Sequence, residues 1–197
     1  MSSINTWRRR ILSYKVKKKL DISNVSFISM NCIGGVLYHD CNQRFLSPTV
    51  NLYFLPSDFI KFVNNLDYYL SLTPEIQMGD SYPVGKLDDI KVFFMHYTSC
   101  EEALSKWEKR KIRIDFDKIF VIMVERDGFS EQDFENFKKI KYPKLLFTKT
   151  KGYKCDSSFY MSRYRKLDQL PDIIPGRHMY DKMRLVNEIN KAYKSNG

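Results

Sequence analysis

A chain of 197 residues with 43% hydrophobic and 15% aromatic residues can bury one core, which excludes disorder over most of its length. No apolar stretch approaches the roughly 20 residues that span a bilayer, and the N-terminus lacks the apolar region of a secretory signal, so we expect a cytoplasmic protein. The four cysteines are widely spaced and form no CxxC pair, which predicts reduced thiols rather than disulfides or a zinc site.

Residues 1–24 are predicted to form a basic, amphipathic N-terminal segment that carries much of the net charge of +10. Apolar residues interleave with its cations at spacings of about four, so a helix over residues 7–20 would be amphipathic. Such a helix either packs its apolar stripe on the domain or makes peripheral contact with an anionic membrane. No DNA- or RNA-binding motif accompanies the charge, so we expect no specific nucleic-acid partner. The cations are Arg8, Arg9, Arg10, Lys15, Lys17, Lys18 and Lys19.

The first predicted strand covers residues 26–31 and ends in Asn31 and Cys32, followed by a turn at Gly34 and Gly35. Backbone amides at the two glycines would cradle a phosphate group. The segment is neither a GxGxxG fingerprint nor a Walker loop, which disfavours dinucleotide and P-loop chemistry. Cys32 would be a nucleophile only with a lowered pKa, and a buried structural thiol is the favoured interpretation.

Three further elements are predicted before residue 90. Residues 51–54 have the pattern of a strand, and an amphipathic helix begins at Pro56. Residues 73–89 are rich in turn-forming residues and are predicted to be a long loop. Long ordered loops in compact domains are often functional, so residues 82–89 are expected to act as a lid that carries Lys86 over the edge of the sheet.

The centre of the chain is predicted to be a strand, a capped helix and a second strand, over residues 90–97, 99–113 and 118–125. This order is typical of a βαβ crossover, in which the two strands are parallel neighbours. The crossover would place His96 and the cluster at residues 125–127 at the same end of the sheet.

The remaining elements are a helix that begins after Ser130, a strand over residues 144–149 and a final helix over residues 181–194. We therefore predict an α/β fold, with residues 25–197 forming a single three-layer domain around a mostly parallel, Rossmann-like sheet. In such a sheet, ligands bind beyond the carboxyl ends of the strands, where the predicted polar residues lie.

The candidate catalytic residues are His96, Glu125 and Asp127. His96 would act as a general base, unless it is only a hydrogen-bonded histidine at a strand end. A carboxylate at Glu125 or Asp127 would take a proton or bind a divalent metal, although Asp127 before Gly128 is also ordinary turn chemistry. Metal dependence and cofactors stay open.

The candidate substrate-binding residues share backbone amides, an amide side chain or a positive charge near a predicted strand end. Arg126 would hold a phosphate in a bidentate manner, and two lysines would add positive charge. The set is Asn31, Gly34, Gly35, Lys86, Arg126 and Lys149.

Several segments, in order along residues 25–150, also carry a family resemblance. They are residues 27–38, 47–49, 55–59 and 82–87, His96 with Tyr97, Trp107 with Arg110 and Arg113, and residues 124–128 and 146–148. This series resembles the exopolysaccharide and capsular polysaccharide biosynthesis proteins that are grouped as a numbered domain of unknown function. Where that family often has Asp before Arg126, this chain has Glu125, which keeps a carboxylate.

The resemblance implies an α/β fold and a role in bacterial surface polysaccharide biosynthesis, and it brings no established reaction. We expect a transferase at the cytoplasmic face of the membrane, using an activated sugar, a phosphate-containing donor or an acyl donor. The alternative is a non-catalytic factor that binds a glycan precursor or another biosynthetic protein. A bound metal or a nucleotide-induced thermal shift would favour the enzyme.

Overall fold

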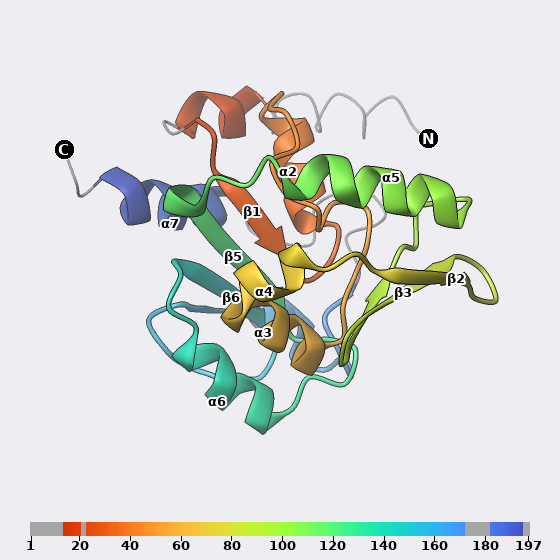
Figure 1. Cartoon of the computed structure of the whole chain (residues 1–197). Coiled ribbons are helices and arrows are strands. Elements are labelled where there is room, and N and C mark those ends of the chain that lie inside the picture. The colour runs from red at the N-terminus through yellow and green to blue at the C-terminus, as the bar shows by residue number, and fades with distance from the viewer. Residues whose placement is uncertain (1–13, 21–22, 172–181, 195–197) are drawn as a thin grey trace, which may run out of the picture.

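The computed structural model describes residues 14–20, 23–171 and 182–194 and shows an α/β fold with two sheets (Figure 1). The larger sheet is parallel throughout, in the order β1-β5-β6-β7, and the smaller is antiparallel, in the order β2-β3-β4. The predicted fold class is confirmed. The strands are β1 (Ser26–Ser29), β2 (Glu75–Met78), β3 (Pro83–Leu87), β4 (Ile90–Phe93), β5 (Ile119–Val124), β6 (Lys144–Thr148) and β7 (Ser158–Tyr160).

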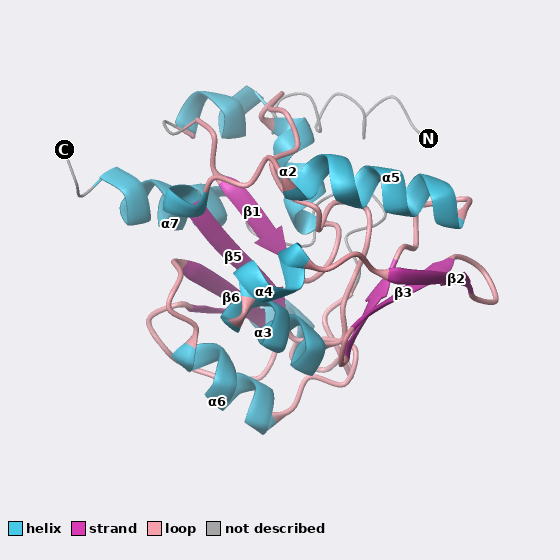
Figure 2. Cartoon of the chain, viewed as in Figure 1, coloured by secondary structure: helices cyan, strands magenta, loops and turns pink. Residues whose placement is uncertain are grey.

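Helices cover both faces of the parallel sheet (Figure 2). The core on one face is shared with α3, α4, α5 and α6, and the core on the other face is shared with α2, α7 and a helical segment at residues 14–19. This arrangement gives three layers. The helices are α2 (Ile33–Asp40), α3 (Pro56–Asn64), α4 (Leu66–Ser71), α5 (Cys100–Lys111), α6 (Glu131–Lys139) and α7 (Lys182–Lys194), with short 3-10 helices η1 (Phe116–Lys118) and η2 (Ser162–Tyr164).

Strand β5 lies between β1 and β6, and all six of its side chains are buried. Successive side chains of a strand point to opposite faces, so both helical layers receive apolar contacts from β5. A continuous apolar run of this kind is typical of a parallel strand covered on both sides. Ile119, Val121 and Met123 belong to one core, whereas Phe120, Ile122 and Val124 belong to the other.

The β5-α6-β6 unit is a crossover between parallel neighbouring strands. Its helix begins at a capping box, in which the Asp133 amide donates to Ser130 Oγ at 3.2 Å and the Ser130 amide donates to Asp133 Oδ2 at 2.9 Å. Phe134 and Phe137 then pack into the core on one face of the sheet. The predictions of a helix after Ser130 and of the strand that follows are confirmed.

The predicted crossover between residues 90–97 and 118–125 is wrong. Strand β4 ends at Phe93 and pairs antiparallel with β3. Only a tight turn joins β3 to β4, with Asp88 at a φ of +53°, and parallel strands need a much longer connection. The strand before α5 therefore belongs to the smaller sheet.

The long loop predicted over residues 73–89 is also wrong, because this segment forms the β2–β3 hairpin. A tight turn joins the two strands, in which the Gly79 amide donates to the Tyr82 carbonyl at 3.0 Å. Residues 51–54 form an extended segment with one isolated bridge, between Tyr53 and Phe93, rather than a strand. That bridge connects the smaller sheet to the segment after α2, where the Phe54 amide donates to the Met30 carbonyl just beyond β1.

Of the amphipathic helix predicted over residues 7–20, the structure describes residues 14–20, and residues 7–13 lie outside the described part. Residues 14–19 are helical, with Val16 and Leu20 buried in the core and Lys17 to Lys19 exposed. The apolar stripe therefore packs on the domain at these two positions. Among the described helices, none has the length and apolar character needed to cross a membrane.

Candidate functional site

Polar residues from three strands lie at the carboxyl edge of the parallel sheet, as predicted: Asn31 after β1, Glu125 after β5 and Lys149 after β6. The chain leaves β1 toward one face, through α2, and leaves β5 toward the other face, through α6. Connections that diverge from neighbouring strands mark the point where ligands bind in open α/β sheets. The candidate site therefore lies at the ends of β1 and β5. We call it the rim site, and its residues are Asn31, Arg126 and Asp127, with Tyr53 and Tyr82 from outside the parallel sheet.

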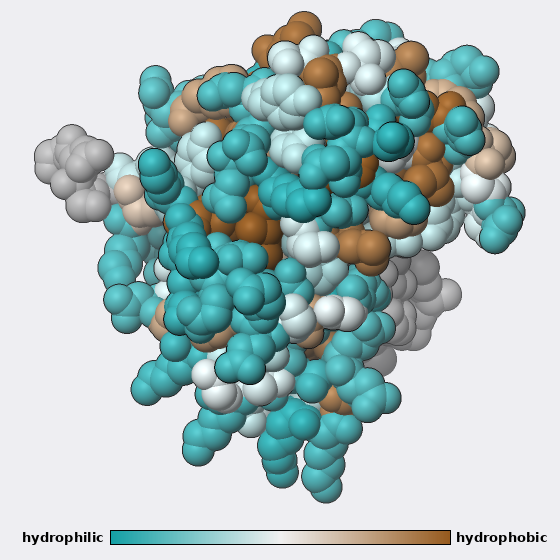
Figure 3. Space-filling view, turned by 60° about the horizontal axis from the view of Figure 1, so that its bottom comes forward, coloured by the Kyte–Doolittle hydropathy of each residue, from teal (hydrophilic) through white to brown (hydrophobic). Residues whose placement is uncertain are grey.

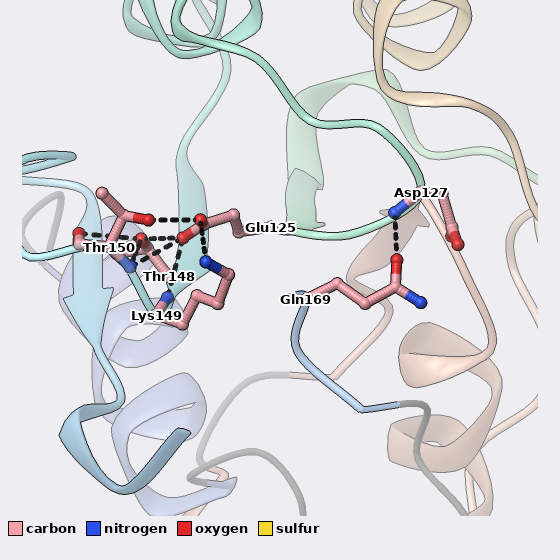
Figure 4. Close-up of polar contacts among 6 residues, drawn as sticks. All are labelled: Glu125, Asp127, Thr148, Lys149, Thr150 and Gln169. Atoms are coloured by element: carbon pink, nitrogen blue, oxygen red, sulfur yellow. Dashed lines mark hydrogen bonds and ion pairs between the residues drawn. The ribbon is translucent and has the colours of Figure 1, made fainter. Parts of the chain in front are cut away.

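Glu125 points from the end of β5 toward the turn that follows β6 (Figure 4). Its Oε2 accepts hydrogen bonds from the backbone amides of Lys149 and Thr150, at 2.8 and 2.9 Å, and from the Thr148 hydroxyl. Its Oε1 accepts one from the Thr150 hydroxyl and lies 3.6 Å from the Lys149 ammonium. Through these hydrogen bonds the carboxylate fixes the turn that follows β6.

Burial by itself would raise the pKa of Glu125. The hydrogen bonds from Thr148, Thr150 and the Lys149 amide outweigh burial and keep the pKa below its ordinary value of 4.5. An ionised carboxylate whose two oxygens already accept several hydrogen bonds is suited to positioning a turn. The catalytic role expected of Glu125 and the phosphate role expected of Lys149 stay predictions.

Asp127 lies away from the Glu125 carboxylate, beside Gln169 (Figure 4), and forms an ion pair with Arg126. Arg126 Nε donates to Asp127 Oδ2 at 2.8 Å, and their side chains are 13% and 23% exposed. Asp127 has a φ of +56°, which places this residue in a tight turn. Its amide donates to Gln169 Oε1 at 2.9 Å, so a later segment of the chain braces the turn.

Two tyrosines from outside the parallel sheet complete the rim site. The hydroxyl oxygens of Tyr53 and Tyr82 lie 2.9 Å apart, and the Tyr53 ring stacks on Phe93 at 4.6 Å. Burial, the hydrogen bond to Tyr82 and the charge of Asp127 raise the pKa of Tyr53, while Arg126 opposes them. The charges of Asp127 and Arg126 thus both act on Tyr53.

Sequence reasoning missed Tyr53, Tyr82 and Gln169 as site residues. Tyr53 had been assigned to a strand and Tyr82 to a lid, and neither segment shows in its own pattern that the two rings would meet. Their contact depends on the β2–β3 hairpin and on the bridge to Phe93. The turn signal at Tyr82-Pro83, placed between two short extended segments, is the one local sign of that hairpin.

Gly34 and Gly35 lie in the first turn of α2, so the turn predicted there is wrong. The Gly34 amide donates to Ser29 Oγ at 3.1 Å, and Asn31 Oδ1 accepts from the Ile33 amide at 3.2 Å. A Cβ on Gly34 would lie 2.9 Å from the Ser29 Cβ, so this glycine lets α2 approach β1 closely. The binding roles expected of Asn31, Gly34 and Gly35 stay predictions.

His96 and Lys86 belong to the smaller sheet rather than to a parallel strand. His96 is exposed in the turn after β4 and forms no hydrogen bond or ion pair with any described residue. Lys86 is exposed on β3 and lines a shallow cavity of about 310 Å³ with Tyr68 and Asp88, near the end of β3 opposite to Tyr82. The segment predicted to be a lid is therefore a strand and its turn.

The described residues offer no group of three or more histidine, cysteine, aspartate or glutamate side chains that could hold a metal ion. The four cysteines are free thiols. What the rim site brings together is a guanidinium, a carboxylate and two phenol groups, which suits an anionic ligand that carries hydroxyl groups.

The chain belongs to a family defined by sequence. Residues 3–191 match a domain of unknown function, DUF1919, and the chain belongs to that family. It is also similar to an uncharacterized protein of Haemophilus influenzae, with 36% identity over 198 residues, covering 97% of this chain and 96% of the relative. Neither match brings an activity, so function is argued from the geometry of the rim site.

Proposed function

We propose that the protein is a transferase in bacterial surface polysaccharide biosynthesis, acting on an activated sugar at the cytoplasmic face of the membrane. The observation that carries the proposal is the Arg126–Asp127 ion pair after β5, whose charges act on Tyr53 of the hydrogen-bonded Tyr53–Tyr82 pair. The polysaccharide setting comes from the resemblance described above.

Each pair has a distinct part in the proposed reaction. The planar guanidinium of Arg126 binds the phosphate of the donor, and Tyr53, which stays protonated at neutral pH, hydrogen-bonds sugar oxygens. Asp127 accepts the proton of the acceptor hydroxyl as that oxygen bonds to the sugar carbon. The bond from sugar to phosphate breaks, and the phosphate-containing group leaves with the electron pair.

This arrangement favours a sugar–phosphate donor over an acyl donor. Phenol and carboxylate groups offer donors and acceptors for sugar hydroxyls, and Arg126 offers charge for a phosphate. The sequence also left phosphate-containing and acyl donors open, and a ligand screen distinguishes these donors from an activated sugar.

A thermal-shift screen tests the proposal with nucleotide sugars, polyprenyl-phosphate analogues and acyl-CoA. A nucleotide sugar at about 100 times its Kd should stabilise the protein by about 2.7 kcal/mol, which raises Tm by several degrees. Arg126→Gln should lose this shift while keeping the Tm of the unliganded protein. A screen in which no nucleotide sugar raises Tm contradicts the proposal.

The second candidate is a non-catalytic factor that binds a glycan precursor or assembles the polysaccharide machinery. The observation in its favour is that Glu125 is held by five donor groups and His96 has no partner among the described residues, so of the three expected catalytic residues only Asp127 pairs with Arg126. A transferase should bind donor normally but lose turnover in Asp127→Asn. Binding without turnover in the wild type would favour the factor.

A further inference from the structure

Arg110 and Arg113, at the C-terminal end of α5, both contact Phe45 in the segment after α2, and Arg44 is the residue directly before Phe45. We call Arg44, Arg110 and Arg113 the arginine cluster. The guanidinium carbon of Arg110 lies 5.1 Å from the centre of the Phe45 ring, and Arg113 Nη1 donates to the Phe45 carbonyl at 3.4 Å. Two guanidinium groups therefore converge on the residue next to Arg44.

The most buried of the three is Arg110, which is only 7% exposed. Its Nη1 donates to the Val50 carbonyl at 3.0 Å and to the Tyr97 hydroxyl at 2.6 Å, and both acceptors are neutral. No described carboxylate forms an ion pair with any member of the arginine cluster. A buried charge without a counter-charge is costly, so this arrangement calls for an anion.

The helix dipole of α5 supplies little negative charge to the cluster. The C-terminal end of a helix such as α5 carries only about half an elementary negative charge, which three guanidinium groups would share. Burial, and after it the charges of Arg44 and Arg110, lower the pKa of Arg113. Arg44 and Arg110 thus both repel Arg113, and a bound anion would relieve that repulsion.

We propose that the arginine cluster is a second anion site that binds a phosphate group. Guanidinium groups present paired N–H donors that match the oxygens of a phosphate, and Arg44 and Arg113 are open enough to solvent to admit one. The proposal shares no residue with the rim site and does not rest on the proposed function.

The phosphate group has two possible sources, a free phosphate compound and a phospholipid headgroup. Ile112, directly before Arg113, is 82% exposed and would contact a lipid surface if the headgroup is the source. The same arginines would bind the phosphate in either case, and the experiment separates the two sources.

Isothermal titration calorimetry of the full chain with pyrophosphate at low salt tests the site. Arg44→Gln combined with Arg113→Gln should weaken pyrophosphate binding by at least about tenfold, because each removes a charge-assisted hydrogen bond. The matched control, Lys106→Gln with Lys109→Gln, removes the same charge from exposed positions of α5 and should change binding less than about twofold. Both side chains of the test pair are accessible, so the variant should fold, and an unchanged Tm checks this.

The titrations are repeated in an Arg126→Gln background, so that failure of the rim site and failure of the arginine cluster are distinguished. Vesicles of phosphatidylcholine with and without phosphatidic acid give the lipid arm. Binding of phosphatidic acid vesicles that is lost in the cluster variant and weakened by Ile112→Ser assigns the lipid source, whereas binding of pyrophosphate alone assigns the free compound. Equal losses in the cluster and control variants, or no saturable binding of either probe, would overturn the proposal.

Discussion

At the scale of single residues, Glu125 connects the end of one strand to the turn after the next. The hydrogen bonds that lower its pKa exist only in the folded protein, so the ionised carboxylate stabilises the fold. A group whose folded pKa lies below its unfolded value contributes this stability above the unfolded value, which is 4.5 here. The contribution disappears as the pH falls through the folded pKa.

Glu125→Gln should therefore lower the free energy of unfolding by about 2 kcal/mol at neutral pH, the usual range for hydrogen bonds to a charged group. Urea denaturation at pH 7 and at acidic pH measures it. The difference between variant and wild type should narrow as the pH falls below 4.5. Glu135→Gln is the control, because its exposed pair with Lys138 should contribute less than about 1 kcal/mol. Equal stability of Glu125→Gln and wild type would contradict the role assigned to Glu125.

The position of Glu125 could be predicted from the sequence, but its environment could not. An apolar run that ends in charged residues predicts a strand end at the edge of the sheet, and β5 confirms it. The donors that surround the carboxylate come from Thr148 to Thr150, more than 20 residues away. Their approach depends on the β5–β6 register, which no local pattern encodes.

At the scale of elements, the contact between α2 and β1 positions Asn31 at the rim site. Gly34→Ala should destabilise the protein by about 1–3 kcal/mol, because the new Cβ would lie 2.9 Å from the Ser29 Cβ and force the helix outward. Gly152→Ala is the matched control, since nothing lies within 4 Å of its added Cβ, and it should be neutral or slightly stabilising. Thermal denaturation compares the two, and an equally stable Gly34→Ala would show that α2 is not held this closely.

Helices that begin at a capping residue could be predicted from the sequence, whereas the partner of each strand could not. Ser99 and Ser130 cap α5 and α6 as expected, because a capping side chain acts within three residues. Strand β4 was assigned to the wrong sheet, since an apolar run shows that a strand is buried without showing its neighbour. Its true partner, β3, was hidden because it lies within residues 73–89, whose turn-forming residues predict a loop.

At the scale of the whole molecule, the exposed cations of the N-terminal segment are the groups that could contact an anionic membrane. Val16 and Leu20 are buried against the domain, so contact with an anionic membrane through this segment would depend on its cations. The face of the molecule in Figure 3 is predominantly hydrophilic, with apolar side chains in separate small patches. Peripheral membrane contact stays a prediction.

Co-sedimentation with anionic vesicles tests that contact. Changing Arg8, Arg9, Arg10, Lys17, Lys18 and Lys19 to Gln should reduce the bound fraction several-fold, because each cation near an anionic surface contributes about 1 kcal/mol. Raising the salt to about 0.5 M should release the wild type in the same way. Equal binding by both forms, or binding that resists salt, would rule out an electrostatic contact through this segment.

The central claim is that the rim site, where β1 and β5 end, is the place where ligand binds. Calorimetric titration of a nucleotide sugar tests it with three proteins: the wild type, Arg126→Gln, and Lys86→Gln as a control that removes the same charge from the exposed strand β3. We predict that Arg126→Gln weakens binding at least about tenfold at unchanged Tm, while Lys86→Gln binds within about twofold of the wild type. Full affinity in Arg126→Gln, or the larger loss in Lys86→Gln, would contradict the claim.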